Sequence, residues 1–259
     1  MEILFSFLIC LLATTIGGIS GVGGGVIIKP VLDATSGMPV ATVSFLSGCT
    51  VLAMTITSML RSRGGEVKVE PRRGTLLAIG AAVGGVVGKE LFELVRASGG
   101  SAVSVAQQVM MIVLTLGVLV YTLNRPRIAA KDVKNPAACV TIGLVLGLLS
   151  AFLGIGGGPI NLAVLYYFFS MDTKTAALNS LYIILFSQGA SFLNTILRGT
   201  VPEFQWPVLI VMVIGGIVGG TLGRSISKRL SNSGVDRLFF WLLIAITGIS
   251  CYNLVRCFV

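Results

Sequence analysis

The sequence predicts an all-α polytopic membrane protein built from two copies of one unit, and three observations support this fold class. Hydrophobic residues make up 54% of the 259-residue chain and charged residues only 11%, which is too little polar surface for a soluble domain. The long apolar stretches lack the alternation of a half-buried strand, so we expect them to be helices. A glycine-rich stretch occurs once in each half, as GVGGG at 21–25 and GIGGG at 154–158, so the two lie half a chain apart.

Ten apolar segments are expected, five in each half. Six are about long enough to cross a hydrocarbon core, which takes roughly 20 residues; they are 38–60, 74–95, 103–123, 175–197, 207–223 and 238–257. The other four flank the glycine stretches and are 3–16, 26–36, 137–153 and 159–170. At ~1.5 Å rise per residue these four cover less than a core of ~30 Å. We therefore expect glycine-broken hairpins that meet near the middle of the membrane.

The duplication continues on the later helices. GGVVGK at 84–89 aligns with GGTLGR at 219–224, at nearly the same separation as the two glycine stretches. Small residues four positions apart let two helix backbones approach closely, so the sequence predicts a packing role for these glycines. We expect Lys89 and Arg224, which directly follow them, to extend toward opposite faces of the membrane.

The loops with many positive charges predict how the chain is oriented. We expect the basic loops to be cytoplasmic and the loops with few charges to lie outside. The basic loops are 61–73, 124–135 and 224–237; the others are 96–102, 198–206 and the C-terminal end. Equivalent loops of the two copies then fall on opposite faces, so we expect inverted repeats with both termini outside. The expected parts are a first repeat at 1–123, a cytoplasmic linker at 124–136 and a second repeat at 137–259, within one integrated membrane domain.

The composition disfavours several functional classes. The chain has five cysteines, no CxxC pair and no histidine, so we expect neither a metal site nor a cofactor. The formal net charge of +9 is explained by the basic loops, so we expect no nucleic-acid partner. Without paired carboxylates or a nucleophile elbow, the chain is not expected to be an enzyme, and no catalytic residue is assigned.

The two glycine stretches are the predicted site. Non-helical backbone at membrane depth is tolerated where it is buried in protein or lines an aqueous cavity. The helix starts near Gly25 and Gly158 are expected to direct free N–H groups and a positive dipole end into a central pocket, which suits an anion. The alternative is that the glycines only allow close helix packing. The candidates from the two loops are Ser20, Gly21, Gly23, Gly24, Gly25, Gly154, Gly156, Gly157 and Gly158.

Four polar side chains complete the candidate set. Lys29 follows the first loop within an apolar run, where a cation is costly enough to indicate a substrate or coupling role. Asp33 lies at i+4, and an ion pair with Lys29 is the alternative explanation. In the second copy we expect Asn161 to supply a neutral donor. Asn179 and Gln188 are expected to face protein or a cavity, with helix-to-helix hydrogen bonding as the alternative.

The glycine segments resemble the TauE/SafE family of sulfite exporter-like permeases. The resemblance is carried by IGGISGVGGG at 16–25 and LSAFLGIGGGP at 149–159, with the duplication around them, and it covers essentially the whole chain. It implies transport of sulfur-containing anions such as sulfite or sulfoacetate across a bacterial inner membrane, by a multi-pass protein. Lys29 and the segment 159–161 depart from the family pattern, so the identity of the anion stays open.

Together, the resemblance and the broken helix in each copy favour a secondary transporter of small sulfur-containing or organic anions. We expect it to act as an exporter by alternating access. A passive anion channel is the alternative. The expected partners are a small anionic substrate and the lipid bilayer, and a homodimer is an assembly that the sequence leaves open. The driving force stays open among uniport, proton coupling and exchange.

Overall fold

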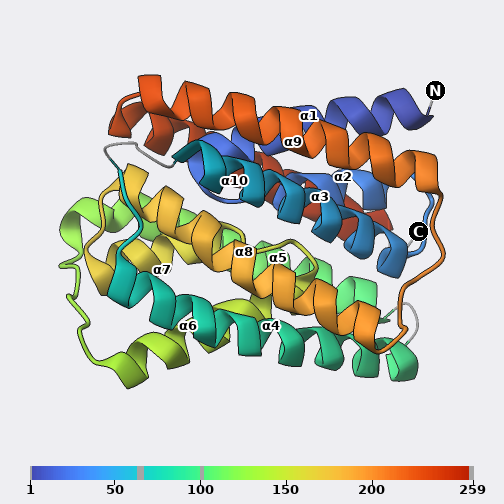
Figure 1. Cartoon of the computed structure of the whole chain (residues 1–259), viewed down its shortest axis with the longest axis horizontal. Helices are drawn as coiled ribbons and strands as arrows, with labels where there is room; N and C mark the ends of the chain where they lie inside the picture. The colour runs from blue at the N-terminus through green and yellow to red at the C-terminus, as the bar shows by residue number, and fades with distance from the viewer. Residues whose placement is uncertain (1, 63–66, 100–101, 257–259) are drawn as a thin grey trace.

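Ten α-helices and one short 3₁₀ helix make up the described part of the chain (Figure 1). The computed structural model describes residues 2–62, 67–99 and 102–256, and no strand occurs within them. The predicted all-α class is confirmed. The elements are α1 (Glu2–Ser20), α2 (Gly25–Thr35), α3 (Val40–Ser62), α4 (Pro71–Gly99), α5 (Ala102–Asn124), η1 (Arg125–Arg127), α6 (Pro136–Leu153), α7 (Pro159–Phe169), α8 (Thr173–Leu197), α9 (Trp206–Arg229) and α10 (Asn232–Arg256).

A short helix follows each glycine stretch. α2 and α7 have 11 residues each, which is too few to span a bilayer. Within the described residues, eight helices are long and apolar enough to cross a membrane, and α1 and α6 are among them. α1 and α6, with 19 and 18 residues, are thus the longer arms of the two hairpins. In α1 the helix continues beyond residue 16, through Gly17 and Gly18, to Ser20.

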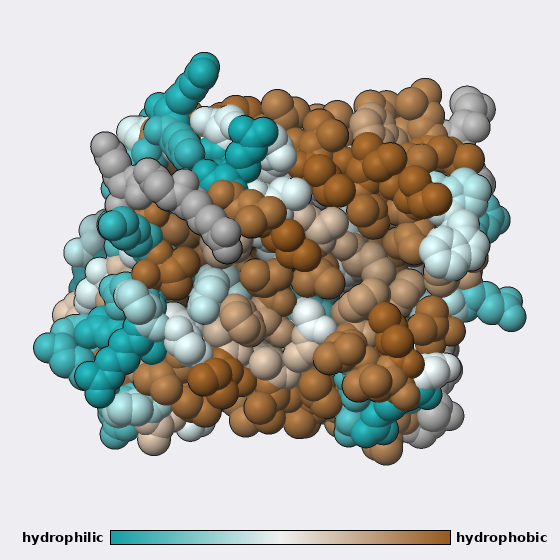
Figure 2. Space-filling model, in the orientation of Figure 1, coloured by the Kyte–Doolittle hydropathy of each residue, from teal (hydrophilic) through white to brown (hydrophobic). Residues whose placement is uncertain are grey.

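The surface changes character along the long axis of the molecule. In Figure 2 hydrophobic side chains form a band across the middle, and hydrophilic side chains gather toward the two ends. Large apolar side chains on several helices, including Leu12, Val113, Ile210 and Trp241, are more than half exposed. An apolar surface this extensive is what a lipid bilayer covers. The chain is therefore a multi-pass membrane protein.

The helices of the two halves run in opposite directions. In Figure 1, α1 starts at the right end of the molecule and runs left, whereas α6 starts at the left end and runs right. α3 and α8 differ in the same way. The start of α1 and the end of α10 lie at the right end, and the basic linker between α5 and α6 lies at the left end.

Glycines join the fourth helix of each half to the first helix of the other half. A Cβ added to Gly84 would meet the carbonyl oxygen of Leu144 in α6, and one added to Gly219 would meet that of Leu11 in α1. The neighbouring turns repeat this relation in the pairs Gly80–Val140, Gly88–Leu148, Gly215–Phe7 and Gly223–Thr15. The α4–α6 contact and the α1–α9 contact are therefore equivalent, and each joins a helix of one half to a helix of the other. The packing role predicted for these glycines is confirmed.

The linker between the halves is held against its neighbours. The N–H of Val133 donates to the carbonyl oxygen of Phe168, at the end of α7, at 2.9 Å. Asp132 lies 2.7 Å from Arg73 at the start of α4 and 3.2 Å from Lys134. Hydrogen bonds from Lys134 and Arg73 hold the pKa of the Asp132 carboxyl below its usual range. The linker therefore contacts a helix of each half.

Candidate functional site

Glycine in left-handed conformations builds the two interior loops. In the first loop Gly21 and Gly23 have φ of +79° and +83°. In the second loop all four glycines have φ between +67° and +121°. Residues with a Cβ rarely adopt such angles, whereas glycine adopts them without steric cost. Gly154 ends α6 as a left-handed cap, and its N–H donates to the carbonyl oxygens of Ser150 and Ala151.

Gly24 and Gly25 are required for a different reason, which is close packing. Gly24 has φ −70°, which any residue adopts. A Cβ on Gly24 would lie 2.6 Å from the Cγ2 atom of Thr14, and one on Gly25 would meet the carbonyl oxygen of Ile155 in the other loop. In these two positions the space around the backbone, and not its dihedral angles, excludes a side chain.

The two loops contact each other in the protein interior, as the sequence predicted. The N–H of Gly158 donates to the carbonyl oxygen of Val22 at 3.1 Å. A Cβ on Gly23 would lie 3.4 Å from the carbonyl oxygen of Gly156. The prediction that the N–H near Gly158 is free for a substrate is wrong, because Val22 accepts it and Pro159 has none to offer.

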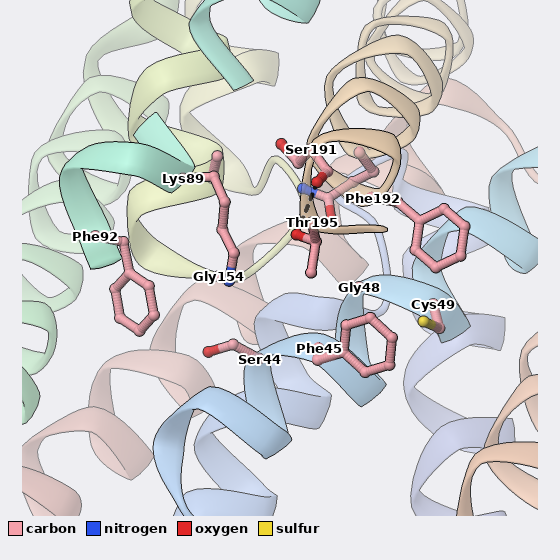
Figure 3. A pocket seen from close by; sticks show the side chains of 12 residues that line it. Ser44, Phe45, Gly48, Cys49, Lys89, Phe92, Gly154, Ser191, Phe192 and Thr195 are labelled. Atoms are coloured by element: carbon pink, nitrogen blue, oxygen red, sulfur yellow. Dashed lines mark hydrogen bonds between the residues drawn. The ribbon is translucent and has the colours of Figure 1, made fainter. Parts of the chain in front are cut away.

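A small cavity lies beside the crossing loops. We call it the Lys89 cavity, and its volume is about 40 Å³. This is room for roughly three water molecules or one small anion. Figure 3 shows Lys89 extending from α4 into this cavity, with Ser44 from α3 and Thr195 from α8. The lining residues are Ser44, Phe45, Gly48, Cys49, Lys89, Phe92, Ala151, Gly154, Gln188, Ser191, Phe192 and Thr195.

Lys89 supplies positive charge to this cavity. Its Nζ lies 3.0 Å from the Oε1 atom of Glu93, one helical turn further on, and 5.0 Å from the ring centre of Phe92. The Lys89 side chain is 13% exposed. The prediction that Lys89 extends to a membrane face is wrong, because its side chain lines a cavity between α3, α4, α6 and α8. A lysine in this position attracts an anion into a space that is otherwise partly apolar.

Lys29 lies beside Gly154, which lines this cavity, but its charge is directed elsewhere. A Cβ on Gly154 would lie 3.3 Å from the Cε atom of Lys29 and 2.7 Å from the Oγ atom of Ser44. The Lys29 Nζ lies 2.8 Å from the Oδ2 atom of Asp33, so the predicted ion pair is present. Lys29 is 3% exposed and lines a second, polar cavity together with Asp33 and Arg256. In this conformation Asp33 neutralises the positive charge of Lys29.

Two of the predicted amide side chains lie near the crossing loops. Gln188 lines the Lys89 cavity, and its Oε1 atom lies 3.2 Å from the position of a Cβ on Gly48. Asn161 is 1% exposed, and its Oδ1 atom has no hydrogen-bond partner. Its Nδ2 atom lies 3.1 Å from the position of a Cβ on Gly157. The Asn161 side chain therefore packs against the second loop.

Two further candidates have partners within the protein. The Ser20 hydroxyl donates to the carbonyl oxygen of Ile16 at 2.9 Å and accepts the N–H of Val22 at 3.4 Å, which supports the first loop. The Asn179 Oδ1 atom accepts the N–H of Glu70 at 3.2 Å, and its Nδ2 donates to Thr175 at 2.9 Å. Asn179 joins α8 to the start of α4, as the helix-to-helix alternative predicted.

Four polar residues that line the cavity are absent from the sequence-based candidates. They are Ser44, Lys89, Ser191 and Thr195. A signal existed for the last two, because Gln188, Ser191 and Thr195 are spaced i, i+3 and i+7 and so share one face of a helix. Both hydroxyls have hydrogen-bond partners. The Ser191 hydroxyl donates to the carbonyl oxygen of Gly85, and the Thr195 hydroxyl donates to the carbonyl oxygen of Ser191, each at 2.9 Å.

A metal site has no support in the described part of the chain. No group of three or more His, Cys, Asp and Glu residues within it is placed to hold an ion. The cations at the site, Lys89 and Lys29, are instead suited to binding negative charge.

The chain is similar to several proteins that are named as probable membrane transporters. The chain is 25% identical to the probable membrane transporter protein YunE of Bacillus subtilis (strain 168), over 91% of this chain and 92% of the relative. A probable membrane transporter protein of Xylella fastidiosa (strain Temecula1 / ATCC 700964) is 29% identical over 41% of this chain and 40% of its own. The probable membrane transporter protein MamO of Magnetospirillum gryphiswaldense is 31% identical over 38% of this chain and 16% of its own.

No solved structure matches the chain. The family model described as sulfite exporter TauE/SafE matches residues 6–250, which is nearly the whole sequence. That match includes both glycine loops, the helices that carry them and every residue of the Lys89 cavity. The chain therefore belongs to the sulfite exporter TauE/SafE family of bacterial membrane transporters.

Proposed function

We propose that this protein is a secondary transporter that exports small sulfur-containing or organic anions, such as sulfite or sulfoacetate, across the inner membrane. No chemical step is assigned to it. The observation that carries the proposal is the Lys89 cavity beside two crossing glycine loops. A cation in a small space next to broken helices is the arrangement expected at a transporter's substrate site.

The positive charge at this site comes from side chains. The N–H of Gly158 is bonded to Val22 and that of Gly154 to the end of α6, so neither is free in this conformation. Lys89 is the cation that faces the cavity, and Ser44 lies there with an Oγ atom that has no partner. An anion that displaces Glu93 from Lys89 gains a charge-assisted hydrogen bond. Lys89 and Ser44 are therefore the proposed primary ligands.

Alternating access is proposed from the duplication. The two repeats, at 1–123 and 137–259, are proposed to be related by inversion, and three observations support this. Their helices run in opposite directions, their loops differ in positive charge, and the α1–α9 and α4–α6 contacts are equivalent. Two inverted halves can exchange conformations, which closes the site on one side and opens it on the other.

Export has an available driving force. An inside-negative potential moves an anion outward with ~2.3 kcal/mol per charge per 100 mV. Such transport needs no nucleotide, and it proceeds by uniport unless an ion is coupled to it.

Flux measurements in proteoliposomes test the proposal. Purified protein is reconstituted, and uptake of labelled sulfite is measured against concentration under an imposed potential, with protein-free liposomes as the control. Sulfoacetate, thiosulfate and a plain carboxylate such as acetate compete in parallel. We expect saturable uptake with preference for sulfur oxyanions. Uptake that rises linearly with concentration, without competition, indicates a passive anion channel instead.

A further inference from the structure

Arg224, on α9, is a buried cation that lacks an anionic partner in the described structure. It is 4% exposed, and its Nε atom has no hydrogen-bond partner. No salt bridge between described residues includes it. The prediction that Arg224 extends to a membrane face is therefore wrong. A buried, unpaired charge is costly, so an unpaired arginine inside a transporter needs a reason to be there.

Arg224 occupies the position in the second half that Lys89 occupies in the first. The alignment of GGVVGK at 84–89 with GGTLGR at 219–224 pairs the two cations, which directly follow Gly88 and Gly223. The structure preserves the equivalence, because Gly88 packs on Leu148 of α6 as Gly223 packs on Thr15 of α1. Each cation thus directly follows a close contact between a fourth and a first helix.

The polar lining of the Lys89 cavity also has a counterpart. When the glycine stretches at 21–25 and 154–158 are aligned, the polar residues of α8 that line the cavity correspond to Thr55, Ser58 and Ser62 of α3. All three are buried. The Ser58 hydroxyl donates to the carbonyl oxygen of Gly220 at 3.4 Å, and the backbone N of Arg224 lies 3.7 Å from the position of a Cβ on Gly18. Polar residues of α3 therefore pack against α9 one turn before Arg224, and α1 packs against the Arg224 backbone.

We propose that Arg224 is a second anion ligand, which receives the substrate when the inner side of the protein opens. This inference rests on the proposed transport function and extends it to a named inner site. In the structure a cavity lies beside Lys89, whereas the side chain of Arg224 is buried. Exchange of the two halves opens the space around Arg224.

Two polar contacts join α9 to neighbouring helices one turn beyond Arg224. The Lys228 Nζ donates to the carbonyl oxygen of Arg61, at the end of α3, at 3.1 Å. The Ser227 hydroxyl donates to the carbonyl oxygen of Ile19, at the end of α1, at 3.4 Å. Opening breaks these bonds and exposes the Arg224 guanidinium to the cytoplasm.

The inner site is more strongly cationic than the outer one. Lys89 has Glu93 at i+4, and this carboxylate competes with a substrate for the lysine. The residue equivalent to Glu93 is Lys228, so Arg224 has a second cation at i+4 in place of an acid. An anion is therefore captured more tightly from the cytoplasm than from outside, which suits an exporter.

Sided flux measurements test this proposal through Arg224→Gln. Arg229→Gln is the matched control, because it removes the same charge from an exposed position further along α9. We expect Arg224→Gln to raise the KM for sulfite at the cytoplasmic face by about tenfold to a hundredfold, with the external KM within about threefold. An unchanged cytoplasmic KM, or equal increases at both faces, overturns the proposal.

A labelling experiment does not depend on sulfite being the substrate. In a cysteine-free protein, Ser227→Cys places a thiol close to Arg224 along α9, at a position that is 1% exposed. A sulfonate-bearing methanethiosulfonate added from the cytoplasmic face should react about tenfold faster than a trimethylammonium-bearing one, because of the nearby guanidinium. Arg224→Gln should remove this preference, whereas Arg224→Lys and Arg229→Gln should keep it.

The labelling result separates the two proposals. A thiol that does not react from the cytoplasm, or that reacts equally with both reagents, overturns the inner site even if sulfite is transported. A charge preference that depends on Arg224 supports the inner site even if another anion proves to be the substrate.

Discussion

Gly158 donates its backbone N–H to the carbonyl oxygen of Val22 at 3.1 Å, and this bond joins the two glycine loops. The loops lie in opposite halves of the chain, so the bond also joins the two halves at their crossing point. Because the Gly158 N–H is bonded to Val22, it is not available to an anion in this conformation. The loops therefore hold the halves together, and we propose that Lys89 and Ser44 bind the substrate.

We predict that Gly157→Val abolishes transport. Gly157 has φ +121°, a region that costs a residue with a Cβ about 1–3 kcal/mol, and a Cβ there would also meet the side chain of Ile184. Gly24→Val should act in the same way through Thr14, by crowding alone. Sulfite flux in proteoliposomes measures the effect, at equal amounts of membrane-inserted protein.

Gly117→Val is the control for these substitutions. Gly117 lies in α5, and a Cβ there would meet nothing within 4 Å. This variant should transport normally. Normal flux from Gly157→Val and Gly24→Val as well would show that the loops only separate helices.

Lys89→Gln should weaken substrate binding from outside. The loss of a hydrogen bond to a charged group amounts to about 1.5–3 kcal/mol, which corresponds to an external KM about 10 to 150 times higher. Lys89→Arg should retain part of the affinity, since it keeps the charge but changes the shape of the donor. Lys68→Gln, at an exposed position outside the helices, is the control. An external KM unchanged by Lys89→Gln would remove Lys89 from the site.

The Lys29–Asp33 pair gives a prediction that separates binding from stability. If Lys29 only neutralises Asp33, then Lys29→Gln leaves a buried carboxylate and destabilises the protein by about 3–5 kcal/mol. The double variant Lys29→Gln with Asp33→Asn removes both charges and should restore stability and transport. Thermal unfolding and flux are measured on the single and double variants. Restored stability without restored flux would instead assign Lys29 a role in substrate binding or coupling.

The proposed orientation predicts how two loops react with an impermeant thiol reagent. Ala130→Cys in the basic linker and Thr200→Cys in the loop between α8 and α9 both place the new thiol at an exposed position. In cysteine-free protein in intact cells, Thr200→Cys should be labelled from outside. Ala130→Cys should be labelled only after the membrane is permeabilised. Labelling of both from the same face would exclude inverted repeats in this orientation.

The helices could largely be predicted from the sequence. Hydrophobic runs are long where a helix must span a bilayer, so the predicted 175–197 lies within α8, which covers Thr173–Leu197. The break after each first helix was visible because only glycine permits the left-handed turns at Gly21 and Gly154. Helix length and the glycine breaks both depend on residue types within one segment, so they can be read from the sequence.

The site was less predictable because it depends on how the helices cross. Lys89 directly follows a packing glycine, and only the packing of α4 against α6 and α8 shows that it faces a cavity. The N–H of Gly158 was expected to be free, and its partner Val22 lies in the other half of the chain. Contacts between distant segments decide both features, and spacing within a segment does not reveal them.

Counterflow of labelled sulfite distinguishes a carrier from a channel, because only a carrier exchanges substrate across a closed membrane. Proteoliposomes are loaded with unlabelled sulfite and diluted into a trace of labelled sulfite at zero membrane potential. We expect transient accumulation of label above the external concentration, stimulated by internal sulfite and absent with Gly157→Val. Entry of label that never exceeds equilibrium and does not respond to internal sulfite would show that the protein is not a sulfite carrier.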